Sequence, residues 1–353
     1  MEKTNGFVER LEASTWTNWL VVYIRTYVGI LAALFLMVII LHFATDKFLT
    51  QNNVINVLRQ ISTNTNLAIG VMLAILLAGI DLTSGAIVAL SGALAAKLLT
   101  QYGFSIPLAL LCGCLVGALA GLVNGCIIAF TGMPPFVVTL AMMNICRGSA
   151  YLVANGKPIR VPTTTYGAFE EIGTGYLEFK IPRFWSVTQD IAPHWELTLP
   201  YPVIYTAFFL LLTFFFLSQT RLGRHIYAVG GNREAARFSG INPAKIEIIV
   251  YTYSGFLAAV AGVVLAARMA SGQPAVGMGY ETDAIAAAVL GGASMSGGVG
   301  TVGGLIIGAL IIGILSNGLN LIGVNSFWQY VAKGVVIILA VYMDIYRKRK
   351  ERF

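Results

Sequence analysis

Two long stretches of this sequence, Leu98–Cys146 and Ala284–Ala332, contain no charged residue. Charged residues make up 11% of the whole chain and hydrophobic residues 57%, whereas a soluble domain carries roughly 25% and 45–50% respectively. Such a chain has too little polar surface to cover a soluble globule of its size. A bilayer core, in contrast, accepts about 20 uncharged residues per helix. The sequence therefore predicts an all-α polytopic membrane protein.

The distances between charged residues predict about ten transmembrane helices in a single permease domain, 1–353. Glycine and proline at Gly132, Pro134 and Pro135 divide the first uncharged stretch into two spans, because neither residue continues a helix well. The last three spans share one long apolar region, which is divided at Gly297-Gly298 and at Asn320–Asn325. In chain order, the expected spans fall in Tyr27–Phe43, Arg59–Asp81, Asp81–Lys97, Leu98–Cys146 (two), Tyr201–Leu217, Ile248–Ala267 and Ala284–Met343 (three).

Lysine and arginine predict the orientation, because they concentrate in short cytoplasmic segments. They gather in the segment 220–247 and again in the tail, at Arg347, Lys348, Arg349, Lys350 and Arg352. Both regions are therefore expected in the cytoplasm, and the number of spans then places the N-terminus there as well. The loop 155–200 is expected on the periplasmic side. The polar stretch before the first span indicates that no cleavable signal peptide is present.

An internal repeat links the two halves of the chain. Gly117-Ala118-Leu119 leads to Asn124-Gly125, and Gly308-Ala309-Leu310 leads to Asn317-Gly318. Spans four and nine carry these blocks in opposite directions, which predicts an inverted repeat of spans 2–5 and 7–10, as found in transporters. The alternative is that glycine-rich helices resemble one another by composition alone. Glycines recur every four residues in both blocks, which favours close helix packing, at Gly113, Gly117, Gly121 and Gly125 and at Gly300, Gly304 and Gly308.

Polar residues inside the apolar spans are candidates for the translocation pathway or for helix breaks. They are Asp81, Thr83, Asn124, Asp283, Asn317 and Asn320. An unpaired carboxylate at the bilayer centre costs at least about 2.5–3.5 kcal/mol, so the two acids should face protein, water or the membrane edge. We favour helix capping for both acids, at the starts of spans three and eight, and bridging between helices for the asparagines. Arg147 is expected either to snorkel to the membrane interface or to contact the pathway.

Sequence motifs for catalysis, metal binding and nucleotide binding are missing from the sequence. The four cysteines lie in apolar stretches without metal-binding spacing, which is typical of small hydrophobic residues. We therefore expect no enzymatic activity, no metal and no cofactor in this chain. If nucleotide drives its function, ATP binds to a partner subunit.

The segment between Asn232 and Gly240 predicts a short exposed helix. Asn232 is a favourable N-cap and Gly240 a favourable C-terminal stop, and the helix between them would present Phe238 beside Arg233 and Arg237. Such a helix is suited to docking in the groove of a soluble partner. A solvated connector is the alternative.

Several blocks carry a resemblance to a known family. They are Gly79-Ile80-Asp81-Leu82, Tyr280-Glu281-Thr282-Asp283-Ala284, Val289-Leu290-Gly291-Gly292 and Asn317-Gly318-Leu319-Asn320, together with a Glu-Ala-Ala-x-x-x-Gly pattern at Glu234–Gly240. In these blocks, over almost its whole length, the sequence resembles the permease subunits of bacterial ABC sugar importers of the ribose, galactose and xylose type, and most of all the ribose permeases. In that family the Glu-Ala-Ala pattern belongs to the loop that docks on the ATP-binding subunit. The resemblance thus implies an ATPase-coupling set of Asn232, Arg233, Glu234, Ala235, Ala236, Arg237 and Gly240 in the cytoplasmic loop 220–247.

The function implied by the resemblance is import of a monosaccharide, ribose or a related sugar, across the bacterial inner membrane. The implied partners are an ABC ATP-binding subunit, a periplasmic sugar-binding protein and a second permease chain in a homodimer, within membrane lipid and without nucleic acid. Three alternatives remain open: an ion-coupled secondary transporter that uses Asp81 or Asp283, an ABC permease for branched-chain amino acids, and a structural membrane protein without transport activity. The sequence leaves the identity of the sugar open.

Overall fold

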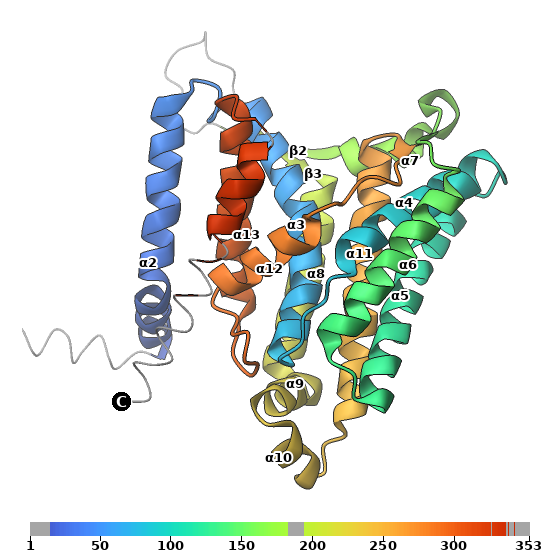
Figure 1. Ribbon diagram of the computed structural model, residues 1–353. Coiled ribbons are helices and arrows are strands. Elements are labelled where there is room, and N and C mark those ends of the chain that lie inside the picture. Colours follow the sequence, from blue (N-terminus) through green and yellow to red (C-terminus); the bar gives the residue numbers. More distant parts are fainter. Residues whose placement is uncertain (1–14, 183–193, 326, 337, 339–341, 343–353) are drawn as a thin grey trace, which may run out of the picture.

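A computed structural model describes residues 15–182, 194–325, 327–336, 338 and 342 of the chain. Figure 1 shows a bundle of long helices with a few short strands, which confirms the all-α prediction. The residues 327–336 form a further helix. The labelled elements are α2 (Thr15–Ala44), α3 (Gln51–Leu76), α4 (Ser84–Thr100), α5 (Ile106–Thr131), α6 (Pro135–Val153), β1 (Ile159–Arg160), α7 (Thr163–Thr174), β2 (Tyr176–Pro182), β3 (His194–Pro200), α8 (Tyr201–Gln219), α9 (Arg221–Gly231), α10 (Arg233–Phe238), α11 (Pro243–Arg268), β4 (Ser271–Gly272), α12 (Tyr280–Leu290) and α13 (Val302–Leu321).

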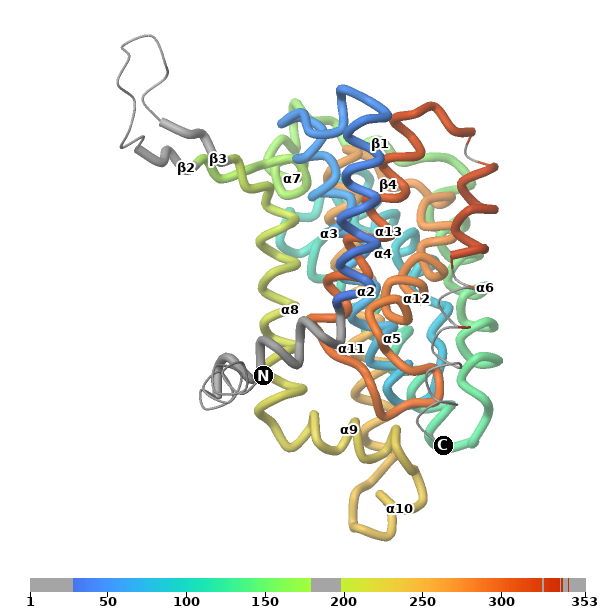
Figure 2. Tube along the Cα trace, turned by 90° about the vertical axis from the view of Figure 1, so that its left-hand side faces the viewer, coloured from blue at the N-terminus to red at the C-terminus, as the bar shows by residue number. Residues whose placement is uncertain are grey.

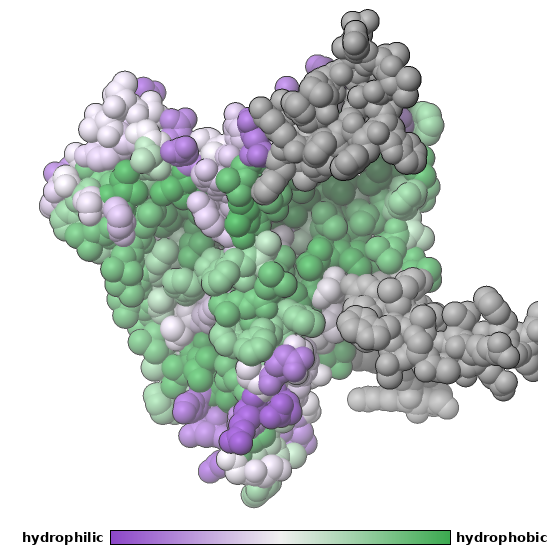
Figure 3. All heavy atoms as spheres, turned by 180° about the vertical axis from the view of Figure 1, so that it is seen from behind, coloured by the Kyte–Doolittle hydropathy of each residue, from purple (hydrophilic) through white to green (hydrophobic). Residues whose placement is uncertain are grey.

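The apolar surface of the bundle matches a membrane environment. Among the described residues, five helices are long and apolar enough to cross a bilayer, namely α5, α6, α8, α11 and α13. α2, α3 and α4 lie where the first three spans are expected. Figure 3 shows hydrophobic residues over the middle of one face and hydrophilic residues toward its two ends. The polytopic membrane prediction is confirmed.

The two ends of the bundle carry different structures, as Figure 2 shows. One end, here called the hairpin end, carries α7 and the antiparallel pair of β2 and β3. β1 and β4 form a second, shorter antiparallel pair. The other end, here called the α10 end, carries α9 and α10.

The eighth expected span is a discontinuous helix rather than a continuous one. α12 contains 11 residues and is about 16 Å long, roughly half of a 30 Å hydrocarbon core. The residues 273–279 before it form a non-helical segment, in which Gly277 and Gly279 have positive φ. α4 likewise begins only at Ser84, after a largely non-helical segment, 77–83. Both halves of the chain thus contain a discontinuous helix, as transporter folds do.

The glycine stripe of α5 packs against α11, as the sequence predicts. A Cβ atom added at Gly113 would press on Val263, and one added at Gly125 would press on Ile248. These two contacts show that α5 and α11 run antiparallel, because the residue numbers rise along one helix as they fall along the other. At Gly121 the backbones approach so closely that a Cβ atom would overlap the carbonyl oxygen of Tyr251.

The first helix of the first repeat, α3, makes the same kind of antiparallel contact with the third helix of the second repeat, α13. α13 runs antiparallel to α3, with Gly300 beside Leu76 and Gly313 beside Ile61. Gly308 fits against the carbonyl oxygen of Ala287, so α12 packs on the glycine stripe of α13. The unit α3–α4–α5–α6 therefore corresponds to α11–α12–α13 and the helix 327–336, in the opposite sense, which supports the predicted inverted repeat.

Replacing Gly121 with alanine is expected to lower the free energy of unfolding by about 1–3 kcal/mol, since the added methyl group forces α5 away from α11. Gly148→Ala is the matched control, because a Cβ atom at Gly148 meets nothing within 4 Å. Unfolding of both purified variants in detergent measures the difference. Equal stability of the two variants would contradict the close packing of these helices.

Candidate functional site

The short helix α10 forms as the sequence predicts. The side-chain Oδ1 of Asn232 accepts a hydrogen bond of 2.9 Å from the backbone N–H of Ala235, which is an N-cap interaction. Gly240 has a φ of +83°, and the next N–H, of Ile241, donates to the carbonyl of Ala236 at 3.0 Å. A residue with a side chain would be strained at that φ, so Gly240 ends the helix.

The surface of α10 is open to solvent. Phe238 is 87% exposed. Such exposure of a phenylalanine is unusual outside a lipid-facing surface. Of the predicted coupling residues, only Ala236 is buried, and the exposed ones are Asn232, Arg233, Glu234, Ala235, Arg237 and Gly240. An exposed aromatic side chain among charged groups is typical of a protein interface.

An ion pair fixes α10 to the membrane-embedded part of the chain. Arg233 Nε lies 2.8 Å from Oε1 of Glu247, and its Nη2 lies 3.4 Å from Oε2. This hydrogen bond, more than the charge of Glu247, raises the pKa of the Arg233 guanidinium above its ordinary value, so the arginine stays charged. Glu247 lies in the second turn of α11. Its role was not predicted, because the helical pattern of α11 does not show which residue it faces.

Asp81, Thr83 and Asn124 come together at the first helix break. Asp81 is 1% exposed. Its Oδ1 accepts hydrogen bonds from the backbone N–H of Thr83 at 2.9 Å and from the Thr83 hydroxyl, and its Oδ2 accepts one from the Ser254 hydroxyl at 2.6 Å. Asn124 donates to the Thr83 hydroxyl oxygen at 3.3 Å. Asp81 therefore accepts a backbone N–H, as expected. It is not the N-cap of α4, however, because Thr83 occupies that position.

Several polar side-chain atoms around this cluster lack a hydrogen-bond partner in the described part of the chain. The Asn124 Oδ1 and the hydroxyls of Ser84 and Tyr251 are buried and have no hydrogen-bond partner among the described residues. Burial of unpaired polar atoms costs free energy. The start of α4 thus retains unused hydrogen-bonding capacity inside the bundle.

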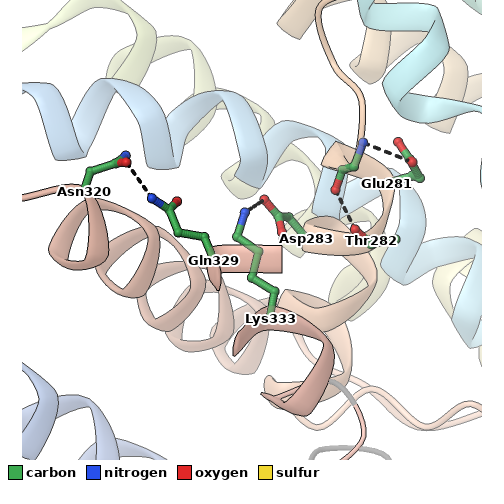
Figure 4. A network of polar contacts seen from close by, with 7 residues as sticks. Glu281, Thr282, Asp283, Asn320, Gln329 and Lys333 are labelled. Atoms are coloured by element: carbon green, nitrogen blue, oxygen red, sulfur yellow. Dashed lines mark hydrogen bonds and ion pairs between the residues drawn. The ribbon is translucent and has the colours of Figure 1, made fainter. Parts of the chain in front are cut away.

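Asp283 does not cap α12, which corrects the capping interpretation. It lies inside the first turn of that helix, and Gly279 occupies the N-cap position. Instead, its Oδ2 forms an ion pair of 2.7 Å with Lys333 Nζ, as Figure 4 shows. The two side chains are 6% and 19% exposed. The pair joins α12 to the helix 327–336.

The two asparagines of α13 bridge helices, as expected, but at separate places. Asn317 exchanges hydrogen bonds of 3.0 and 3.1 Å with Asn53 on α3. Asn320 Oδ1 accepts a bond of 2.8 Å from Gln329, on the same helix as Lys333, and Figure 4 shows this contact beside the ion pair. Asn320 and Asp283 therefore both hold the helix 327–336, while Asn317 holds α3.

Arg147 supports the segment that leads into α12. Its Nη1 donates to the carbonyl oxygens of Pro274 and Val276 at 3.0 and 2.6 Å. The guanidinium thus bonds backbone within the chain, a contact that the sequence did not predict. In the same region, Glu281 Oε1 accepts the N–H of Gly279 at 3.2 Å, and its Oε2 has no partner among the described residues.

Comparison with known proteins identifies relatives over nearly the whole chain. The family described as "Branched-chain amino acid transport system / permease component" matches residues 53–341. The ribose import permease protein RbsC of Escherichia coli K12 is 42% identical over 316 residues, which cover 89% of this chain and 92% of the relative. RbsC of Bacillus subtilis is also 42% identical, over 90% and 92% of the two chains. The xylose transport system permease protein XylH of Haemophilus influenzae is 34% identical over 93% of this chain and 98% of its own. No solved structure matches.

Proposed function

The chain belongs to the family of import permeases that includes the ribose and xylose permeases, and we propose that it is the membrane-spanning subunit that carries a monosaccharide, ribose or a related sugar, into the cytoplasm. The observation that carries this proposal is identity of 42% to a ribose permease over 89% of the chain. The family description names branched-chain amino acids. We favour a sugar because the relatives named above are sugar permeases whose matches cover 89–93% of this chain.

The partners follow from the same proposal. An ABC ATP-binding subunit binds and hydrolyses ATP, and α10, with the coupling residues of the loop 220–247, docks on it. The α10 end and both termini then face the cytoplasm, as the lysine and arginine distribution favours. The hairpin end faces a periplasmic sugar-binding protein, and a second copy of the permease completes the pathway.

The mechanism uses the two inverted halves of the fold. Because Arg233 joins α10 to Glu247 of α11, movement imposed on α10 by the ATP-binding partner reaches a helix of the second half directly. α11 packs closely on α5 of the first half. Rocking of one half against the other would open the pathway alternately to each side.

We favour the ABC permease over the ion-coupled alternative, because both acids that the alternative would use are paired. Asp81 accepts hydrogen bonds from Thr83 and Ser254, and Asp283 is paired with Lys333. A proton-coupling carboxylate has to exchange its proton with water during each cycle. The contacts of these two acids favour a structural role over proton exchange.

Truncating Phe238 to alanine is expected to weaken binding of the ATP-binding subunit by about 30-fold, because a buried aromatic anchor contributes about 2 kcal/mol or more to an interface. Affinity is measured with the purified subunits, and sugar uptake with the assembled transporter. Phe214→Ala is the control, since Phe214 is also exposed but lies on the apolar helix α8. Unchanged affinity in Phe238→Ala would contradict docking at α10.

A further inference from the structure

The end of α3, where the first helix break begins, lies directly against α9. Gly230 of α9 approaches the carbonyl oxygen of Leu76 so closely that an added Cβ atom would overlap it. Leu76 is the last residue of α3, and the residues 77–83 lead from it to α4. The close approach is between backbone atoms, and it is possible only because Gly230 has no side chain.

The connection that follows α12, the short helix of the second half, meets α9 at the same place. The residues 291–301 connect α12 to α13, and within them the N–H of Gly298 donates to the carbonyl of Leu76 at 2.9 Å. The hydroxyl of Tyr227 on α9 donates to the carbonyl of Gly300 at 2.8 Å. Gly297, with a φ of +82°, would overlap the carbonyl of Gly230 if it carried a Cβ atom. One helix therefore contacts the connections of both discontinuous helices.

α9 is also joined to the docking helix α10 by a short and hydrogen-bonded link. Only Asn232 separates α9 from α10. Its backbone N–H continues the hydrogen bonding of α9, donating to Ala228 at 3.1 Å, and its side chain caps α10. Displacement of α10 must therefore displace the last turn of α9.

From these contacts we infer that α9 transmits movement of the docking helix to both discontinuous helices at once, with Tyr227 and Gly230 as positioning residues. Energetic coupling between distant sites passes through packed contacts of this kind. The inference rests on the proposed function, which assigns the docking role to α10. It adds a second route to the one through Arg233 and α11, in which both repeats are driven together through one junction at Leu76.

The test uses the complete transporter, reconstituted with its ATP-binding subunit and its sugar-binding protein in liposomes, with ribose as the probe. Tyr227→Phe removes the hydroxyl group and with it the bond to the carbonyl of Gly300. We expect normal binding of the ATP-binding subunit and continued ATP hydrolysis, but a decrease of about threefold or more in ribose imported per ATP hydrolysed, the effect of one lost hydrogen bond. Tyr166→Phe is the matched control, because Tyr166 donates a similar bond to the carbonyl of Leu99 at 2.7 Å, away from α9.

A second pair of variants tests the backbone contact. Gly230→Ala is expected to lower the same ratio by a larger factor, and Gly231→Ala to leave it unchanged, since a Cβ atom at Gly231 meets nothing within 4 Å. An unchanged ratio in Tyr227→Phe, or an equal decrease in Tyr166→Phe, overturns the role of α9 while leaving the proposed function intact. A wild-type permease that fails to bind the ATP-binding subunit overturns both.

Discussion

Replacing Lys333 with methionine is expected to remove most of the folded permease, with a loss of about 3–5 kcal/mol in the free energy of unfolding. The substitution leaves the buried Asp283 carboxylate without the ammonium group that lies 2.7 Å away. A carboxylate inside an apolar bundle has no water to replace that partner. The amount of monodisperse protein after solubilisation, and its unfolding in detergent, measure the effect.

Removing both charges should repair much of that damage. In the double variant Asp283→Asn/Lys333→Met neither position carries a charge, so the double variant should be more stable than Lys333→Met alone. The difference from additivity measures the interaction of the pair. Lys157→Met serves as the control for loss of a lysine, since Lys157 is exposed. A single variant as stable as the wild type would show that the ion pair does not hold the helix 327–336.

The double variant also distinguishes a structural role of Asp283 from a role as a proton relay. If the pair is structural, the neutral double variant imports ribose under ATP hydrolysis at a rate per folded molecule similar to that of the wild type. If Asp283 relayed protons, the double variant would fold and yet fail to transport. The two results require the same preparation, so stability and activity are compared on the same molecules.

Those elements of the fold that depend on local sequence were predictable. The glycines of α5 recur every four residues and therefore lie on one face, so close packing followed from their spacing, although the partner helix did not. The cap at Asn232 and the stop at Gly240 likewise involve neighbours in the sequence. The opposite direction of the two repeats was also predictable, because it follows from the number of spans between them.

What could not be predicted depends on contacts between distant residues. Lys333 is the partner of Asp283, and Ser254 is a partner of Asp81, but nothing in the spacing of these residues pairs them. The short length of α12 was missed for a different reason. Distances between charges count uncharged residues, and the segment before α12 stays uncharged whether it is helical or extended.

Replacing Asp81 with alanine is the second change expected to have a large effect. It removes the acceptor of the Thr83 and Ser254 hydroxyls, and hydrogen bonds to charged groups contribute about 1.5–3 kcal/mol each. The expected loss is therefore at least about 3 kcal/mol in the free energy of unfolding. Asp81→Asn should lose less, because an amide oxygen can still accept from Thr83 while the Ser254 hydroxyl turns to accept from the amide. Yield and detergent unfolding of the two variants, with Ser254→Ala beside them, measure this order.

The same variants decide whether Asp81 acts on the sugar. Asp81 lies inside the bundle, 1% exposed, and its carboxylate oxygens are occupied by Thr83 and Ser254. We therefore expect the few folded Asp81→Asn molecules to prefer the same sugar as the wild type in competition between ribose and xylose. A changed preference at normal abundance would instead place Asp81 in the pathway, and the unpaired atoms of Ser84, Asn124 and Tyr251 would then be its first candidate neighbours.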